Sequence, residues 1–159
     1  MPSTLPRGGR GLHSALALAS ITGLGLVLAA PWAVHRGWWT APLLYAVFDP
    51  VCHQIAARSF HAWGEPLAVC HRCSGLYLGF ALGIACWPFA PGAAARLLDR
   101  PRWIVAFAAP LALDAVLLSN VAASRFGTGL VAAFPVALLA LAAAAQLALP
   151  WRQPRRSFS

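Results

Sequence analysis

Residues 70–83 read CHRCSGLYLGFALG, and this stretch decides how the chain folds. Small residues recur in it at every fourth position, as Gly75, Gly79 and Gly83. On a helix that advances about 100° per residue, Cys70, Cys73 and Tyr77 fall within about 60° of one another and nearly opposite these glycines. The stretch therefore predicts a helix with two faces, one for close packing against a neighbouring helix and one that carries two thiols and a phenol.

The composition around this stretch is that of an integral membrane protein. The chain has 159 residues, of which 60% are hydrophobic and 10% charged, and its mean hydropathy is +0.68. Soluble domains have about 45–50% apolar and about 25% charged residues. All twelve basic residues are arginines, and they lie mostly outside the apolar runs without forming a basic stripe among exposed aromatic residues. These features predict a lipid bilayer as the main partner and argue against a nucleic-acid-binding protein.

Four apolar runs are long enough for the roughly 20 residues that cross a bilayer as a helix. They lie at about 12–34, 67–90, 103–122 and 129–149. We therefore expect an all-α, polytopic fold of about four transmembrane helices in a single domain, residues 1–159. The first run follows Arg7 and Arg10, as a signal peptide would. Its length, and Pro31 directly after the only small-residue cleavage site, favour its retention as a span.

Shorter segments connect these runs. Residues 38–50 are too few to span the bilayer and end in a proline, and their two tryptophans and one tyrosine suit the headgroup level. We expect a short interfacial helix there. Between the third and fourth runs, Gly127 and Gly129 predict a tight turn.

Arginines are distributed unevenly between the two sides of the predicted bundle. Eight lie in the N-terminal tail, the 91–102 loop and the C-terminal tail, which share one side. Arg36, Arg58 and Arg125 lie on the other side, with Arg72 at the membrane edge. By the positive-inside rule, both termini are cytoplasmic. We expect a multi-pass protein of the inner (plasma) membrane with three of its four cysteines on the outer, oxidising face.

Three of the cysteines and one histidine have the spacing of metal ligands. Cys52-His53 is followed by the C-x2-C pair Cys70 and Cys73. A Cys3His set gives a closed tetrahedral zinc site, whereas Cu(I) is satisfied by fewer soft ligands. Cys86 lies about 20 Å further along the helix at about 1.5 Å per residue, so we expect it to be a buried apolar cysteine. The sequence thus predicts a Zn or Cu site at the first four residues.

The same cysteines allow two other interpretations. A structural disulfide from Cys52 to Cys70 or Cys73 would leave one thiol over, as in a structural or assembly subunit that contacts another membrane protein. Alternatively, Cys70 and Cys73 are candidate catalytic residues for thiol–disulfide exchange, in the arrangement of four-helix thiol:quinone oxidoreductases. In that scheme Arg72 lowers a thiol pKa electrostatically and a quinone binds near Tyr77.

Asp114 is the only carboxylate inside a predicted span. Such an acid costs several kcal/mol unless it is paired, protonated or faces a polar cavity, so it is a further candidate catalytic group. We expect it about 12 Å from the outer end of its helix, near the level of Gly75 and Tyr77 and in one pocket with the thiols. The alternative is a structural pair with Arg72 or Arg125, or a hydrogen bond to Tyr77.

Several uncommon residues occur in a recognisable order within about residues 40–130. They are C-H-Q at 52–54, R-S-F at 58–60, C-x-R-C-[ST]-G-[IL]-Y-x-G at 70–79, P-x-x-x-D at 110–114 and, more weakly, R-x-x-[TS]-G at 125–129. In this the chain resembles the small predicted membrane proteins of domain-of-unknown-function family 2085. Ala57 stands where that family often has a glutamate. The resemblance implies a small helical membrane bundle and no particular activity.

The residues together favour an extracytoplasmic transition-metal site, used in the handling or sensing of a metal or in structure. Thiol redox chemistry is the second hypothesis and a structural subunit the third. The sequence assigns no reaction.

Overall fold

The computed structural model of the chain describes residues 7–89, 96, 100, 102–116 and 121–147. Its elements in chain order are α1 (Arg7–His35), α2 (Ala41–Ala46), η1 (Ala56–Arg58), β1 (Ser59–Ala62), β2 (Glu65–Cys70), α3 (His71–Cys86), η2 (Trp87–Phe89), α5 (Arg102–Val116) and α6 (Ala122–Leu147). The ends of three predicted spans, at residues 90, 117–120 and 148–149, lie outside the described residues. The chain is mostly helical, as its sequence predicts.

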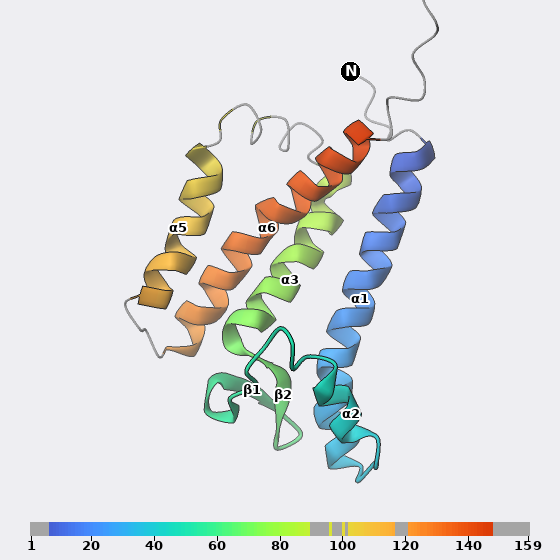
Figure 1. Cartoon of the computed structure of the whole chain (residues 1–159), viewed down its shortest axis with the longest axis vertical. Coiled ribbons are helices and arrows are strands. Elements are labelled where there is room, and N and C mark those ends of the chain that lie inside the picture. Colours follow the sequence, from blue (N-terminus) through green and yellow to red (C-terminus); the bar gives the residue numbers. More distant parts are fainter. Residues whose placement is uncertain (1–6, 90–95, 97–99, 101, 117–120, 148–159) are drawn as a thin grey trace, which may run out of the picture.

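The long helices stand side by side in the order α5, α6, α3 and α1 (Figure 1). α1 begins and α6 ends at the same end of this bundle, where α5 also begins (Figure 1). The β-hairpin and α2 lie at the opposite end, where α3 begins (Figure 1). The candidate site therefore belongs to one end of the bundle, away from the ends of the chain.

The small sheet corrects the all-α prediction. β1 and β2 pair antiparallel with Ala62 opposite Glu65, so that only Trp63 and Gly64 form the turn. Both turn residues have positive φ, 55° and 85°, as a two-residue hairpin turn of type I′ requires. Beyond this turn the strand runs directly into α3 at Cys70, which is paired with Ser59.

The hairpin also corrects the start of the second predicted span, which was placed at residue 67. Residues 65–70 are a strand, and α3 begins at His71. Ala68 and Val69 are fully buried in this strand. Because a buried strand is as uniformly apolar as a membrane helix, hydropathy does not separate the two over a few residues.

The glycine face of α3 packs against the backbone of α6, which confirms the predicted close helix contact. A Cβ at Gly75 would collide with the carbonyl oxygen of Phe126, and one at Gly79 with that of Leu130. At Gly83 a Cβ would lie 2.5 Å from the carbonyl oxygen of Phe134. The two helix backbones approach this closely because no side chain stands between them.

The turn predicted at Gly127 and Gly129 is wrong. α6 begins at Ala122 and contains both glycines. A Cβ at Gly129 would collide with the carbonyl oxygen of Arg72, so this glycine continues the close contact from the α6 side. Gly129, which suggested a chain reversal, instead allows the start of α3 to pack closely against α6.

Apolar side chains cover the outside of the bundle. In α1, Leu18 is 66% and Ile21 68% exposed, and residues 11–35 have a mean hydropathy of 1.8. Residues 122–143 of α6 have a mean hydropathy of 2.0. Both helices are long and apolar enough to cross a membrane, and such an exposed apolar surface needs lipid around it. α3 and α5, with 16 and 15 residues, are shorter.

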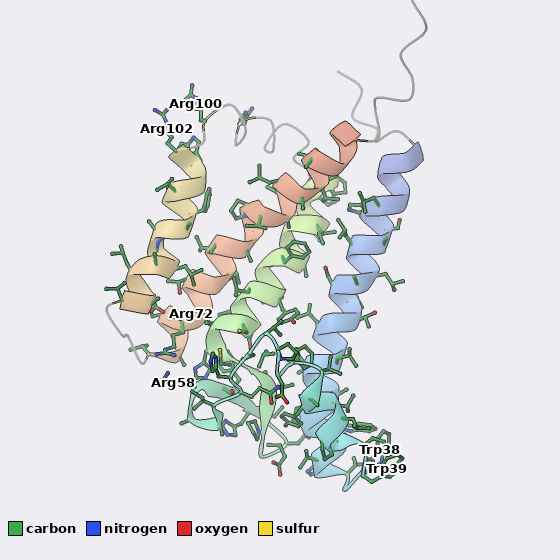
Figure 2. The ribbon with its side chains drawn as sticks, in the orientation of Figure 1. Trp38, Trp39, Arg58, Arg72, Arg100 and Arg102 are labelled. Atoms are coloured by element: carbon green, nitrogen blue, oxygen red, sulfur yellow. The ribbon has the colours of Figure 1, made fainter. Side chains whose placement is uncertain are left out.

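The segment predicted to lie at the interface is only partly helical. α2 covers Ala41–Ala46, and turns precede and follow it. Trp38 and Trp39 precede this helix at the tip of the hairpin end of the bundle (Figure 2), and Trp39 is 85% exposed. An aromatic residue with its ring outside the protein is what a headgroup contact needs.

Candidate metal centre

Three elements bring three cysteines together. Cys52 comes from the loop after α2, Cys70 ends strand β2, and Cys73 lies in the first turn of α3. Their Sγ atoms all lie within 4.8 Å of one another. Cys52 is buried, whereas Cys70 and Cys73 are partly exposed, and none of the three is in a disulfide. The strand-to-helix junction sets the C-x2-C pair, and the loop adds the third thiol.

Hydrogen bonds connect the clustered cysteines and favour negative charge on Cys70. The backbone N–H of Cys70 donates to Sγ of Cys52 at 3.2 Å. Hydrogen bonding by the Cys73 thiol lowers the pKa of the Cys70 thiol to about 4, although desolvation by burial opposes this shift. Because the thiolate is the form that binds a metal or attacks a disulfide, Cys70 is prepared for either reaction.

The three thiols fit a soft metal ion. Zinc bound by thiolates at about 2.3 Å in a tetrahedron holds its sulfur atoms about 3.8 Å apart. The sulfur atoms here are at most 4.8 Å apart, so small side-chain rotations close the set onto an ion. Cysteine sulfur selects zinc and Cu(I) over hard cations such as Mg²⁺.

A hydrogen-bonded frame holds the Cys52 loop against the hairpin. Tyr45 in α2 donates its hydroxyl hydrogen to the carbonyl oxygen of Pro66 in β2 at 2.5 Å. The side-chain amide of Gln54 in turn donates to the carbonyl oxygen of Tyr45 at 2.6 Å. Gln54 has a φ of 49°, which turns the loop just after Cys52. The position of the third thiol therefore depends on α2.

Aromatic contacts fix the hairpin onto the helix ends. Phe60 of β1 packs edge-on against His71, with 4.4 Å between the ring centroids, and against Phe126 of α6 at 5.6 Å. His71 is buried there. It serves the packing at the start of α3, whereas His53 is the histidine near the thiols.

A cavity of about 340 Å³ opens beside the cysteines. It is lined by Val51, Cys52, His53, Gln54, Ile55, Arg58, Cys70, Arg72, Cys73 and Arg125. His53, the fourth predicted ligand, is exposed and is not among the clustered ligand atoms. The structure thus brings three of the four predicted ligands together and leaves the histidine on the cavity wall.

Two further arginines line this wall: Arg58, which had no role in the predicted site, and Arg125, which was an alternative partner for Asp114. Arg58 begins the R-S-F motif, and Arg125 the R-x-x-T-G motif. Arg125 is buried, whereas Arg58 is exposed beside the hairpin, near Arg72 (Figure 2). The two motifs could have pointed to these arginines, because each motif begins with an arginine. The R-S-F motif leads into β1 and the R-x-x-T-G motif lies at the start of α6, and both elements pack at the thiol end.

Asp114 pairs with Arg72, which was one of the alternatives predicted from the sequence. Its Oδ2 accepts a hydrogen bond from Nη2 of Arg72 at 2.5 Å, and its Oδ1 accepts one from the hydroxyl of Ser124 at 2.6 Å. The Asp114 side chain is 3% exposed and that of Arg72 26%. Asp114 lines neither the cavity beside the thiols nor the one beside Tyr77. Asp114 instead contacts Arg72, which lines the cavity beside the thiols, and a pocket shared with the thiols stays a prediction.

The pairing also changes the role expected for Arg72. Its guanidinium is committed to Asp114, and hydrogen bonding by Cys73 is the main cause of the lowered pKa of Cys70. Ser124 was missed by sequence reasoning, because it becomes a partner only through the extra turns at the start of α6. The Arg72–Asp114–Ser124 group joins α3, α5 and α6.

The remaining candidates lie along α3. Tyr77 lines an apolar cavity of about 530 Å³ together with Cys73, and its ring packs edge-on against Phe48 at 5.9 Å. Cys86 ends α3 at the opposite end, beside the buried apolar cluster of Ile84 and Trp87. It is separate from the other three cysteines, as predicted, but it is partly exposed, so the prediction of a buried cysteine is wrong.

Comparison with known proteins gives the chain a family. Residues 52–139 match the family described as predicted membrane protein (DUF2085). The chain is 33% identical over 121 residues to an uncharacterized protein of Methanocaldococcus jannaschii, in an alignment that covers 69% of this chain and 78% of that protein. No solved structure gives a significant match. The matched range contains the three clustered cysteines and Asp114, and the chain belongs to the DUF2085 family of predicted membrane proteins.

Proposed function

We propose that this membrane protein binds one transition metal ion, Zn²⁺ or Cu(I), through Cys52, Cys70 and Cys73. The observation that carries the proposal is the convergence of three Sγ atoms within 4.8 Å from a loop, a strand and a helix. A disulfide needs only two cysteines. A third thiol at the same point is what a metal ion uses.

A fourth ligand to a bound metal ion would come from the cavity beside the thiols, which Cys52, Cys70 and Cys73 all line. Cu(I) is satisfied by three thiolates, whereas Zn²⁺ takes a fourth ligand. His53 on the cavity wall is the candidate for that ligand, and an exchangeable ligand is the other. A closed site suits a structural metal, and an open one suits metal transfer or sensing.

We further propose that all four long helices cross the inner membrane with both termini in the cytoplasm. α3 and α5 would span about 22–24 Å at about 1.5 Å per residue, which is short of the roughly 30 Å hydrocarbon core unless flanking residues continue them. Arg100 and Arg102 lie at the end where α1 begins, opposite the thiol end (Figure 2). This distribution supports a cytoplasmic location for that end.

Thiol–disulfide exchange is the second candidate function, and the lowered pKa of Cys70 favours it. In that reaction a thiolate of a partner dithiol attacks the Cys70–Cys73 disulfide, and the partner's second thiol then closes the partner's disulfide and releases the pair as a dithiol. A membrane quinone would take two electrons and two protons from this dithiol, which becomes the Cys70–Cys73 disulfide again as the quinone becomes a quinol. The two candidate functions differ in the state of the cysteines at rest.

Metal analysis and thiol titration on one sample decide between them. We expect full-length protein purified in mild detergent to carry one equivalent of metal on thiols that react only after chelation. Cys52→Ser, Cys70→Ser and Cys73→Ser should each lose most of the metal, because the remaining thiols lack the geometry to hold it. Cys86→Ser is the matched control and should keep it.

Two results would overturn the metal proposal. One is full metal occupancy after Cys70→Ser, or its loss after Cys86→Ser. The other is metal-free protein with a Cys70–Cys73 disulfide that a reduced partner and a quinone turn over, which would establish the redox function instead. A reporter fused to the C-terminus that is active only outside the cytoplasm would contradict the proposed topology.

A further inference from the structure

Two cavities of opposite character meet at the thiol cluster. The cavity beside the cysteines, about 340 Å³, is lined mostly by polar and charged side chains, with Val51 and Ile55 as the aliphatic exceptions. The second, about 530 Å³, lies between α3, α5 and α6 and is lined by apolar residues except for the Cys73 thiol and the Tyr77 hydroxyl. Val51 and Cys73 line both. Each volume lies within the roughly 300–1,000 Å³ of small-molecule sites.

The polar cavity has a positive charge balance. Arg58, Arg72 and Arg125 line it, and no carboxylate does so in the part of the chain that the structure describes. The Asp114 carboxylate, which pairs with Arg72 from outside this lining, offsets one of the three guanidinium charges. The wall of the polar cavity therefore stays positively charged.

Donors for an anion are present in the same wall. Arg58 is exposed, so its guanidinium can turn into the cavity. The buried Nε of Arg72 has no hydrogen-bond partner among the described residues. Guanidinium groups bind phosphate and carboxylate oxygens with paired, charge-assisted hydrogen bonds.

The apolar cavity extends from the thiols into the helix bundle. Leu76, Tyr77 and Phe80 of α3 form one wall, and Ala108 and Leu111 of α5 face them. It offers a hydrocarbon chain an apolar surface at the depth where a lipid chain already lies in a bilayer. The polar cavity sits at the end of the same helices, at the level of a headgroup.

We propose that the two cavities together bind one anionic amphiphile, with its acidic head among the arginines and its hydrocarbon chain between α3, α5 and α6. The ligand class is a phosphate or carboxylate head on an apolar chain, as in an acidic phospholipid or a polyprenyl phosphate. The site goes beyond the proposed metal function and does not require it. Its head lies beside the thiols, so a metal or a thiolate there would act on or sense the head of a lipid.

Native mass spectrometry of the full-length protein in detergent tests this site with defined probes. Dioleoyl phosphatidic acid, dioleoyl phosphatidylcholine, a long-chain ubiquinone and inorganic phosphate are added separately. We expect one phosphatidic acid to be retained with an affinity at least about tenfold above that of phosphatidylcholine, as a charge-assisted guanidinium–phosphate contact predicts. Inorganic phosphate alone should not displace it, because it lacks the chain.

Two pairs of variants test the two halves of the site. Arg58→Gln should weaken phosphatidic acid about five- to tenfold through loss of a charged hydrogen-bond donor, whereas Arg102→Gln, at the other end of the bundle, should not. Ala108→Phe fills the apolar cavity and should abolish retention. Ala106→Phe, on the same helix but outside the cavity lining, should leave it intact.

Four results would overturn the proposal. Equal retention of phosphatidic acid and phosphatidylcholine would show ordinary surface lipid. Displacement of phosphatidic acid by inorganic phosphate would show a site for a free anion, and displacement by ubiquinone a quinone site. Equal effects within either variant pair would show that the cavities do not hold the ligand. Metal content measured on the same variants separates loss of the lipid site from damage to the thiols.

Discussion

The two faces of α3 differ in how closely the rest of the protein packs against them. On one face, glycines remove side chains so that the backbone of α6 can lie against them. On the other, Cys73 and Tyr77 face cavities and meet residues from a loop and a strand. On the glycine face, an added Cβ would collide with the backbone of α6. The other face carries the Cys73 thiol and the Tyr77 phenol, with a cavity beside them. One helix thus supplies both the rigid contact and the candidate chemistry, and the rigid contact holds the reactive groups in place.

The largest expected effect is on the glycine face. Gly79→Leu places a branched side chain where the carbonyl of Leu130 lies. The α6 backbone cannot rotate away as a side chain does, so we expect a destabilisation above the roughly 1–3 kcal/mol of ordinary overpacking. Size-exclusion chromatography should show little monodisperse protein. Leu78→Ala, one residue away, should give near-normal yield. Equal yields of the two variants would mean that the α3–α6 contact is not as close as described.

A smaller effect is expected from the ion pair beneath the reactive face. Asp114→Asn leaves the Arg72 guanidinium without its carboxylate, and we expect a loss of about 1–3 kcal/mol in stability, below the usual cost for a fully buried pair because the arginine is partly exposed. A thermal shift in detergent measures it. Metal should be retained, and Arg72→Gln combined with Asp114→Asn should recover part of the loss. Unchanged stability with loss of metal would instead assign Asp114 to the site.

The smallest effect concerns the frame around the third thiol. Tyr45→Phe removes the hydrogen bond to Pro66, for which we expect about 1 kcal/mol of destabilisation. Metal affinity should fall slightly, because the Cys52 loop loses a tether. Tyr77→Phe is the control and should change neither, since its ring contact with Phe48 remains. A larger loss of metal in Tyr77→Phe than in Tyr45→Phe would place the phenol of Tyr77 in the site.

Local periodicity was enough to predict the two faces of α3, because both patterns lie within four helical turns. The hairpin was missed because the second half of β2, which contains the buried Ala68 and Val69, continues the apolar run of α3 without a break in composition. Gly129 was read as a turn because glycine permits both chain reversal and close helix packing, and only the neighbouring Arg72 backbone distinguishes them.

The candidate site shows the same limit. Cys70 and Cys73 were predictable as neighbours from helical spacing, and the C-H-Q motif suggested Cys52 as their partner. The position of His53 depends on the backbone turn at Gln54, which no spacing rule contains. That Asp114 pairs with Arg72 and Ser124 depends on how α5 lies beside α3 and α6. The position of His53 and the partners of Asp114 depend on tertiary structure, which decides which polar groups share a pocket.

X-ray absorption spectroscopy at the edge of the metal that copurifies with the full-length protein tests most directly whether the three cysteines bind a metal ion. We expect three sulfur ligands, at about 2.3 Å if the metal is zinc, and a spectrum unchanged by Cys86→Ser. Replacement of any one of Cys52, Cys70 and Cys73 by serine should remove the metal or reduce the number of sulfur ligands to two. A coordination sphere of oxygen and nitrogen alone in the unmodified protein would contradict this expectation.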